Sequence, residues 1–164
     1  MSNLLTKEEL LELGFSSVGE NVVVSPDARF FAINGSLGDN VRIDAFAILT
    51  GNITLGNNVH ISPFCFLGGT GGKIEMANRS GLSTHVSIFT KSDDYTTTNK
   101  GADKVSGDVI IGEGSIIGSG SKIMPGVTIG EEVRAGCNTV LSKDVESGSI
   151  IVSRGIGIVT LASK

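Results

Sequence analysis

The side chains best suited to acid–base chemistry are two adjacent aspartates and two histidines. Asp93 and Asp94 lie in the polar stretch FTKSDDYTTTNKGADK, residues 89–104, and His60 and His85 are the only histidines of the chain. A carboxylate or an imidazole can take a proton from a nucleophile and give one to a leaving group. Two carboxylates that converge on one cavity can also raise each other's affinity for a proton. Asp94, Asp93 and His60 are therefore our candidate catalytic residues.

Other polar side chains close to these residues are candidates for binding a substrate. Thr84 can point a hydroxyl at a ligand, and Tyr95, the only tyrosine, can stack on a ring or anchor its loop. We include His85 with them, although it lies where a turn is expected and histidine is enriched in the left-handed backbone region. The two cysteines, Cys65 and Cys137, form no CxxC or Cys/His cluster, so we predict no metal site.

Composition excludes several classes of partner. The net charge is −4 and no cluster of Lys or Arg stands out, which argues against binding to nucleic acid or to an anionic membrane surface. The start, MSNLLTKEELLEL, places acids within a short apolar run, so it predicts neither an export signal nor membrane insertion. We expect a cytoplasmic protein with one domain and small-molecule partners.

The elements that must position these side chains are revealed by a repeat of six residues. An aliphatic or other apolar residue leads each repeat almost from end to end of the chain. These leading residues are Val18, Val24, Phe30, Leu37, Ile43, Leu49, Leu55, Ile61, Leu67, Met76, Leu82, Ile88, Val105, Ile111, Ile117, Ile123, Ile129, Ala135 and Leu141. Such a period fits neither a helix nor an alternating strand, but it is typical of a repeat architecture.

The fourth position of the repeat indicates a sharp corner. It is often Asn, Asp or Gly, the residues that best tolerate a positive φ. Eleven repeats follow this rule: Asn21, Asp27, Asn40, Asn52, Asn58, Asp108, Gly114, Gly120, Gly126, Asn138 and Asp144. Short strands joined by regular corners, three to a turn, close into a coil, so we predict an all-β parallel β-helix of about six coils.

The boundaries of the parts follow from the same pattern. We predict a short helix at residues 6–14, with Thr6 and Glu9 forming a capping box and Gly14 at its end, that caps the lumen. The coils should span 18–146, with a tail at 147–164. The repeat is interrupted after Phe30, after Leu67 and after Ile88, always at the same corner, so residues 89–104 should form an extruded loop there.

The repeat resembles that of the hexapeptide-repeat acyltransferases, most clearly in IIGSGSKIMPGVTIG and VLSKD. The combination of VHISPF, the insert GGTGG and SDDY resembles the branch that acylates sugars of bacterial surface polysaccharides such as O-antigen or other lipopolysaccharide. This resemblance implies a left-handed coil and a homotrimer with active sites between subunits. It also implies acetyl-CoA or another short acyl-CoA as co-substrate, and a sugar or nucleotide-linked sugar as acceptor.

The resemblance also suggests which residues bind CoA. In this family small residues let the pantetheine arm lie against the coil, which points to Ser119, Gly120, Ala135 and Gly136. Lys143 and Arg154 are the late cations that could meet its phosphates.

The acceptor atom is less well defined by the sequence. Asp93 and Asp94 stand where galactoside and maltose O-acetyltransferases carry a catalytic histidine. A carboxylate suits an ammonium better than a hydroxyl, so we favour the amino group of a nucleotide-linked amino sugar. The alternatives are O-acetylation of a sugar hydroxyl, with His60 as the base, and a non-catalytic β-helix scaffold.

Overall fold

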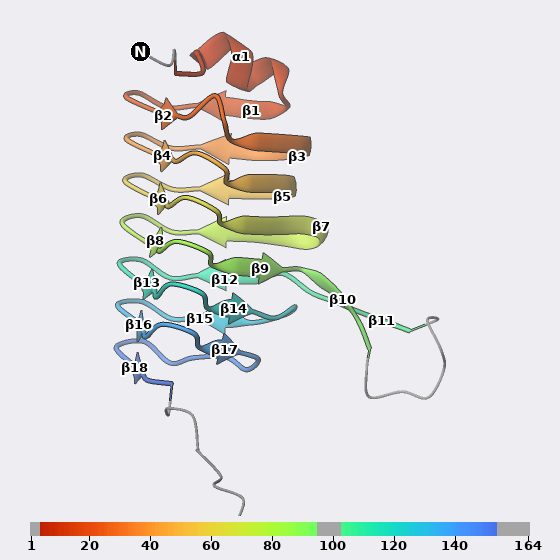
Figure 1. Ribbon diagram of the computed structural model, residues 1–164, viewed down its shortest axis with the longest axis vertical. Coiled ribbons are helices and arrows are strands. Elements are labelled where there is room, and N and C mark those ends of the chain that lie inside the picture. The colour runs from red at the N-terminus through yellow and green to blue at the C-terminus, as the bar shows by residue number, and fades with distance from the viewer. Residues whose placement is uncertain (1–3, 95–102, 154–164) are drawn as a thin grey trace, which may run out of the picture.

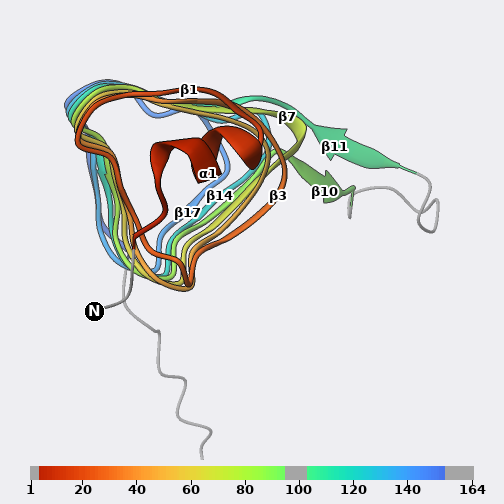
Figure 2. The ribbon, with the colours of Figure 1, turned by 90° about the horizontal axis from the view of Figure 1, so that it is seen from above.

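The protein is a parallel β-helix, as the repeat predicted, and its coil is left-handed, as the resemblance implied. The computed structural model describes residues 4–94 and 103–153. Figure 1 shows the coils stacked along the long axis, and Figure 2 shows that they superpose in a triangular cross-section. No helix among the described residues is long and apolar enough to cross a membrane.

One face of the triangle is a regular sheet of seven parallel strands. In order along the chain, these strands are β2 (Val23–Val24), β4 (Arg42–Ile43), β6 (His60–Ile61), β8 (Gly81–Leu82), β13 (Ile116–Ile117), β16 (Arg134–Ala135) and β18 (Ile150–Ile151). Each strand contributes one turn of the coil, so the described part contains seven turns where about six were expected. The additional strand, β18, lies beyond the coil boundary predicted at residue 146.

The other two faces form a nine-stranded sheet, because its longest strands bend around the corner between them. This sheet comprises β1 (Phe15–Val18), β3 (Arg29–Leu37), β5 (Ile48–Leu55), β7 (Phe66–Met76), β9 (Ser87–Phe89), β12 (Val109–Ile111), β14 (Lys122–Ile123), β15 (Thr128–Ile129) and β17 (Val140–Leu141). Each turn therefore has three corners. We call them the first corner (as in 38–41), the second corner (as in 44–47) and the insertion corner (as in 50–53).

The leading residues of the repeat fill the lumen. All of those predicted are buried except Phe30, which is half-buried against the core, and Val105. Val105 is 42% exposed because the insertion continues past it, and the coil resumes only at Val109. The prediction that Val105 leads a repeat was therefore wrong. Its spacing from Ile111 matched the period, but its strand belongs to the extruded loop.

The fourth position of the repeat adopts positive φ, although not always at the predicted residues. Asn21, Asn40, Asn58, Asn138, Gly114, Gly120 and Gly126 confirm the prediction. Phe46, Phe64, Arg79, His85 and Glu132 do the same without being Asn, Asp or Gly. The prediction was wrong at Asp27, Asn52, Asp108 and Asp144. Asp108 and Asp144 instead each accept a backbone N–H bond from the neighbouring coil, from Lys73 and Thr128 respectively.

All three interruptions of the repeat lie at the insertion corner, as predicted. There the chain makes close backbone contacts between turns, which glycine permits. Gly51 has φ of +80°, and a Cβ built on it would lie 2.4 Å from the carbonyl oxygen of Gly69. A side chain at this position would force the two turns apart.

The helix at the N-terminal end caps the lumen as expected. It spans Lys7–Glu12 (α1), and both halves of the predicted capping box between Thr6 and Glu9 form. Leu10 is buried in the core beneath it, and Gly14 ends the turn with φ of +116°. Figure 1 shows α1 lying across the open end of the first coil.

Because one residue of the two-residue strand β14 is buried in the lumen and the other is exposed, their substitution should change the free energy of unfolding by very different amounts. Ile123→Ala should lower the free energy of unfolding by about 2–5 kcal/mol, because Ile123 is 0% exposed and its removal leaves a cavity. Lys122→Ala, one residue earlier on the outer face, should change it by no more than about 0.5 kcal/mol. Denaturant unfolding of both variants checks this, and similar losses for the two would contradict the assigned face.

Candidate active site

A hairpin projects from the insertion corner and carries the two candidate aspartates. It is formed by β10 (Lys91–Asp93) and β11 (Lys104–Ser106), paired antiparallel, with Asp93 opposite Lys104. The backbone N–H of Asp94 donates to the carbonyl of Asp103 and continues the ladder. Figures 1 and 2 show the hairpin extending away from the triangular body. It corresponds to the extruded loop predicted at residues 89–104.

Thr90 fastens the base of this hairpin to the coil. Its side chain is fully buried, and its hydroxyl donates to the carbonyl of Gly68 at 2.6 Å and accepts from the backbone N–H of Gly71 at 3.0 Å. The backbone carbonyl of Thr90 accepts from the N–H of Gly107 on the returning strand. A Cβ on Gly71 would lie 2.4 Å from the Cβ of Lys91. The GGTGG insert thus provides the close approach that sets the direction of the hairpin.

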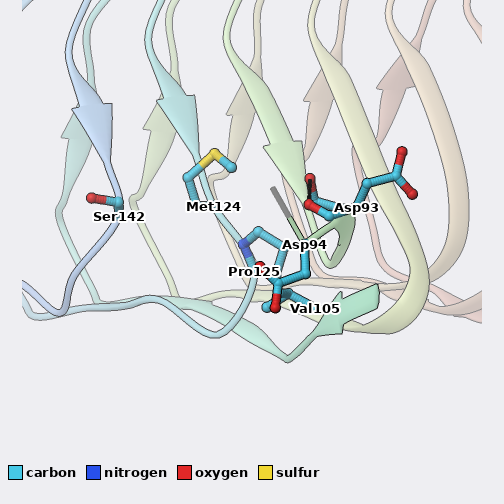
Figure 3. A pocket seen from close by; sticks show the side chains of 7 residues that line it. Asp93, Asp94, Val105, Met124, Pro125 and Ser142 are labelled. Atoms are coloured by element: carbon cyan, nitrogen blue, oxygen red, sulfur yellow. Dashed lines mark hydrogen bonds between the residues drawn. The ribbon is translucent and has the colours of Figure 1, made fainter. Parts of the chain in front are cut away.

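Asp93 and Asp94 both line a pocket of about 250 Å³ at the root of the hairpin. Its other lining residues are Ser92, Val105, Met124, Pro125 and Ser142. Figure 3 shows the two carboxylates pointing in different directions, with Asp94 beside Pro125. Asp93 forms an ion pair with Lys104, and the hydrogen bond and charge of that ammonium hold the pKa of Asp93 below its usual value. The two carboxylates therefore have different surroundings, and Asp93 is committed to a structural partner.

Thr84 and His85 lie at the second corner of the turn that leads into the hairpin. His85 has φ of +61°, so the expectation of a left-handed corner is confirmed. The Thr84 hydroxyl lies 2.8 Å from the carbonyl oxygen of Pro63 and 2.9 Å from Nδ1 of His85. These contacts fix the imidazole relative to the coil.

An aromatic column, which sequence reasoning missed, supports His85 from the turns above. It consists of Phe46, Phe64 and His85, whose rings are stacked with centroids 5.1 Å and 4.9 Å apart. Phe46 and Phe64 both have positive φ and are 54% and 50% exposed, which is costly for bulky apolar side chains. The available signal was spacing: Phe46 and Phe64 are one 18-residue turn apart, and His85 follows after one turn plus three inserted residues.

A shallow hollow lies on the second corner below the aromatic column. Thr84, His85, Ser119, Gly120, Cys137 and Asn138 line it, and its volume is about 350 Å³. Gly120 occupies the place that His85 holds one turn earlier, so no side chain continues the column there. Predicted acceptor-binding residues (Thr84, His85) and predicted CoA-binding residues (Ser119, Gly120) thus meet in one hollow.

The remaining predicted ligand contacts are spread more widely. Ala135 is buried in the lumen, and Gly136 begins the second corner of the next turn beside Cys137. Lys143 is exposed at the insertion corner, next to Ser142 of the aspartate pocket, and not at the hollow. Tyr95 and Arg154 lie outside the described residues.

His60 lies on the flat seven-stranded face and not at a corner, because it belongs to strand β6. Its Nε2 lies 2.8 Å from Oδ2 of Asp44, whose Oδ1 accepts from Nε of Arg42 at 2.7 Å. Burial raises the pKa of Asp44, but the hydrogen bonds from His60 and Arg42 together outweigh it and lower the pKa. Within one chain, His60 lines neither the hollow nor the aspartate pocket.

The cysteines and acids of the described residues suggest no other chemistry. No three His, Cys, Asp or Glu side chains in residues 4–94 and 103–153 lie close enough to hold a metal ion. Cys65 is in the core, where burial raises the pKa of its thiol to about 11. Cys137 is exposed at the edge of the hollow.

Comparison with known proteins identifies the repeat. The family model described as bacterial transferase hexapeptide (six repeats) matches residues 34–69 and 108–143. A dTDP-4-amino-4,6-dideoxy-D-glucose acyltransferase of Escherichia coli is 35% identical over 161 residues, which cover 90% of this chain and 83% of that protein.

Solved structures agree. AntD, an N-acyltransferase from Bacillus cereus, in complex with dTDP and 3-hydroxybutyryl-CoA, matches with a TM-score of 0.81 and 34% identity over 92% of this chain and 85% of AntD. A variant of AntD with dTDP-4-amino-4,6-dideoxyglucose and coenzyme A matches with a TM-score of 0.82 and 33% identity over 95% and 90% of the two chains. The chain therefore belongs to the bacterial transferase hexapeptide family and is one of its acyltransferases.

Proposed function

We propose that this protein transfers an acetyl or other short acyl group from CoA to the amino group of a nucleotide-linked amino sugar, at sites formed between the subunits of a homotrimer. The activities of the Escherichia coli relative and of AntD support this choice of reaction, donor and acceptor.

The observation that carries the proposal is the separation of the two halves of the site. Asp94 lies at the root of a hairpin on the insertion corner, whereas Thr84 and His85 lie on the second corner. These are different edges of one rigid prism, and the hairpin points outward from it. A second copy of the chain can supply the missing half to each, because a head-to-tail contact that repeats by rotation closes into a ring.

In this arrangement the carboxylate of Asp94 from one subunit faces the acceptor bound at the second corner of its neighbour. An ammonium group on the acceptor is attracted to a carboxylate, and it must lose a proton before its nitrogen can attack the thioester. Asp94 serves as that carboxylate. Asp93 supports the hairpin through its ion pair with Lys104.

The hollow at the second corner suits the acyl end of CoA. Ser119 and Gly120 present small groups, and an added Cβ at Gly120 would lie 2.3 Å from Oδ1 of Asn138, so a larger residue there would displace that side chain. No Lys or Arg lines the hollow among the described residues. Lys143, at the insertion corner, is then a candidate to reach the CoA phosphates from a neighbouring subunit. The roles of Tyr95 in binding the acceptor and of Arg154 in binding the CoA phosphates remain predictions.

A nucleotide-linked amino sugar is a precursor in surface-polysaccharide biosynthesis, so we place the enzyme in the assembly of O-antigen or a related lipopolysaccharide, in the cytoplasm.

A transfer assay followed by mass spectrometry tests the reaction. The purified protein should add an acetyl group from acetyl-CoA to the amine of dTDP-4-amino-4,6-dideoxyglucose. Asp94→Asn should lower kcat at least about a hundredfold, as expected for loss of a proton acceptor. Asp93→Asn is the matched control, and it should retain most of the activity because Asp93 is bound to Lys104.

Other results of this assay lead to the alternatives. Acylation of simple glycosides but not of the amine, with no effect of Asp94→Asn, would indicate O-acetylation and return attention to His60. Absence of binding to every acyl-CoA tested would favour the scaffold.

Complementation tests the shared site. Asp94→Asn and Ser119→Tyr, which fills the hollow, should each inactivate a homotrimer. Co-expression of the two differently tagged subunits should restore activity, since random assembly gives about a quarter of the sites both intact halves. Mixed oligomers isolated through both tags are assayed for transfer. If they form but stay inactive, each site takes both halves from one subunit and the shared site is wrong.

A further inference from the structure

We propose that His85 is a catalytic residue that carries a proton from the attacking amine to the departing CoA sulfur. This inference rests on the proposed function and assigns a step that neither Asp94 nor His60 performs. It follows from the hydrogen bonds of Thr84, the aromatic column and the hollow at the second corner.

The hydrogen bonds of Thr84 determine which ring nitrogen of His85 carries the proton. Its hydroxyl has one hydrogen and lies 2.8 Å from the carbonyl oxygen of Pro63, which can only accept. That hydrogen therefore goes to Pro63, and the hydroxyl oxygen must accept from His85, whose Nδ1 lies 2.9 Å away. In the neutral ring Nδ1 then bears the hydrogen, and Nε2 keeps its lone pair for a ligand.

The aromatic column fixes the plane of the ring. Phe64 lies against one face of His85 with an interplanar angle of 14°, and Phe46 supports Phe64 in turn. The opposite face is not covered by the next turn of the coil, since that turn has Gly120 at the equivalent position. Two phenylalanines held at positive φ and half exposed cost stability, so their retention is explained by a role in holding this ring.

The hollow places His85 between the two reactants. Thr84 and His85 line its upper edge, and Ser119 and Gly120, our candidates for contact with CoA, line the next turn. Cys137 is the only other titratable side chain among the described residues that line it. Thr84 and Phe64, which contact the imidazole, carry no charge. No Asp or Glu lines the hollow among the described residues, so the carboxylate comes from Asp94 of a neighbouring subunit in the proposed trimer.

The proton balance of the reaction leaves a step for such a residue. An ammonium becomes an amide by losing two protons, while the CoA thiolate gains one. The first leaves through Asp94 to solvent. As the new C–N bond forms, the second moves from nitrogen to Nε2 of His85. When the C–S bond breaks, Nε2 returns this proton to sulfur. An imidazole can accept and donate a proton at the same nitrogen, which suits it to both transfers.

Substitution of His85 can be made without disturbing the corner. Asparagine occupies the same corner two turns later, at Asn138, with φ of +56°, so His85→Asn keeps the left-handed backbone. In the amine assay it should lower kcat about a hundredfold or more and leave KM for acetyl-CoA within about threefold.

His85→Gly provides a readout that a structural role would not give. Glycine accepts the positive φ and leaves a space against the Phe64 ring, so added imidazole should restore part of the activity. Restoration should increase with the basicity of substituted imidazoles. Phe64→Leu, as the comparison, should lower kcat several-fold without responding to imidazole.

The outcomes separate this inference from the proposed function. Failure of the wild-type protein to acylate the amine overturns both. If the wild type is active but His85→Asn keeps its kcat, or imidazole has no effect on His85→Gly, His85 only lines the site and the shuttle is wrong, while N-acylation stands.

Discussion

Stacking of equivalent residues from turn to turn is the constraint on which the structure depends. Each leading residue in the lumen lies over its equivalent in the next turn, as Ile43 lies over Ile61 and Ile117 over Ala135. The backbone hydrogen bonds run between the same turns, so burial and pairing impose one register. A residue placed out of this register would put an apolar side chain outside and leave backbone groups unpaired.

The same register extends to polar groups on the surface. At the first corner the side-chain oxygens of Asp39, Asn57 and Asn78 each accept a backbone N–H bond from the preceding turn, from Glu20, Asp39 and Asn57 respectively. At the second corner the stacked groups are aromatic, and they lead to His85. The corners therefore differ in role. The first corner aligns successive turns through hydrogen bonds, and the second corner carries side chains of the candidate site.

Most of the fold could be predicted from the sequence because a six-residue period has few structural solutions. The period predicted the coil, the common corner of the insertions and the cap with Thr6 and Glu9. It failed at Val105, where spacing alone could not show that the chain was still in the hairpin. It also gave one turn too few, because the stretch before Ile150 is shorter than a full repeat.

The site was less predictable, since its contacts join residues from different turns. The pairing of His60 with Asp44 joins a strand to the corner of the preceding turn, and the stack of Phe64 on His85 depends on the residues inserted after Leu67. Residue type suggested Thr84, Asp93 and Asp94, but only the fold shows that Thr84 and the aspartates lie on different edges of the prism.

The seven turns contribute unequally to the candidate site. The first turn, which contains β2, includes no part of the hollow, the hairpin or the aromatic column, and its coil strands pair only with the next turn. The N-terminal end therefore works as a modular spacer beneath α1. Duplication or loss of a whole turn there would change the height of the molecule without disturbing the second corner around His85. The length of such a protein can drift in evolution in steps of one coil while its chemistry is preserved.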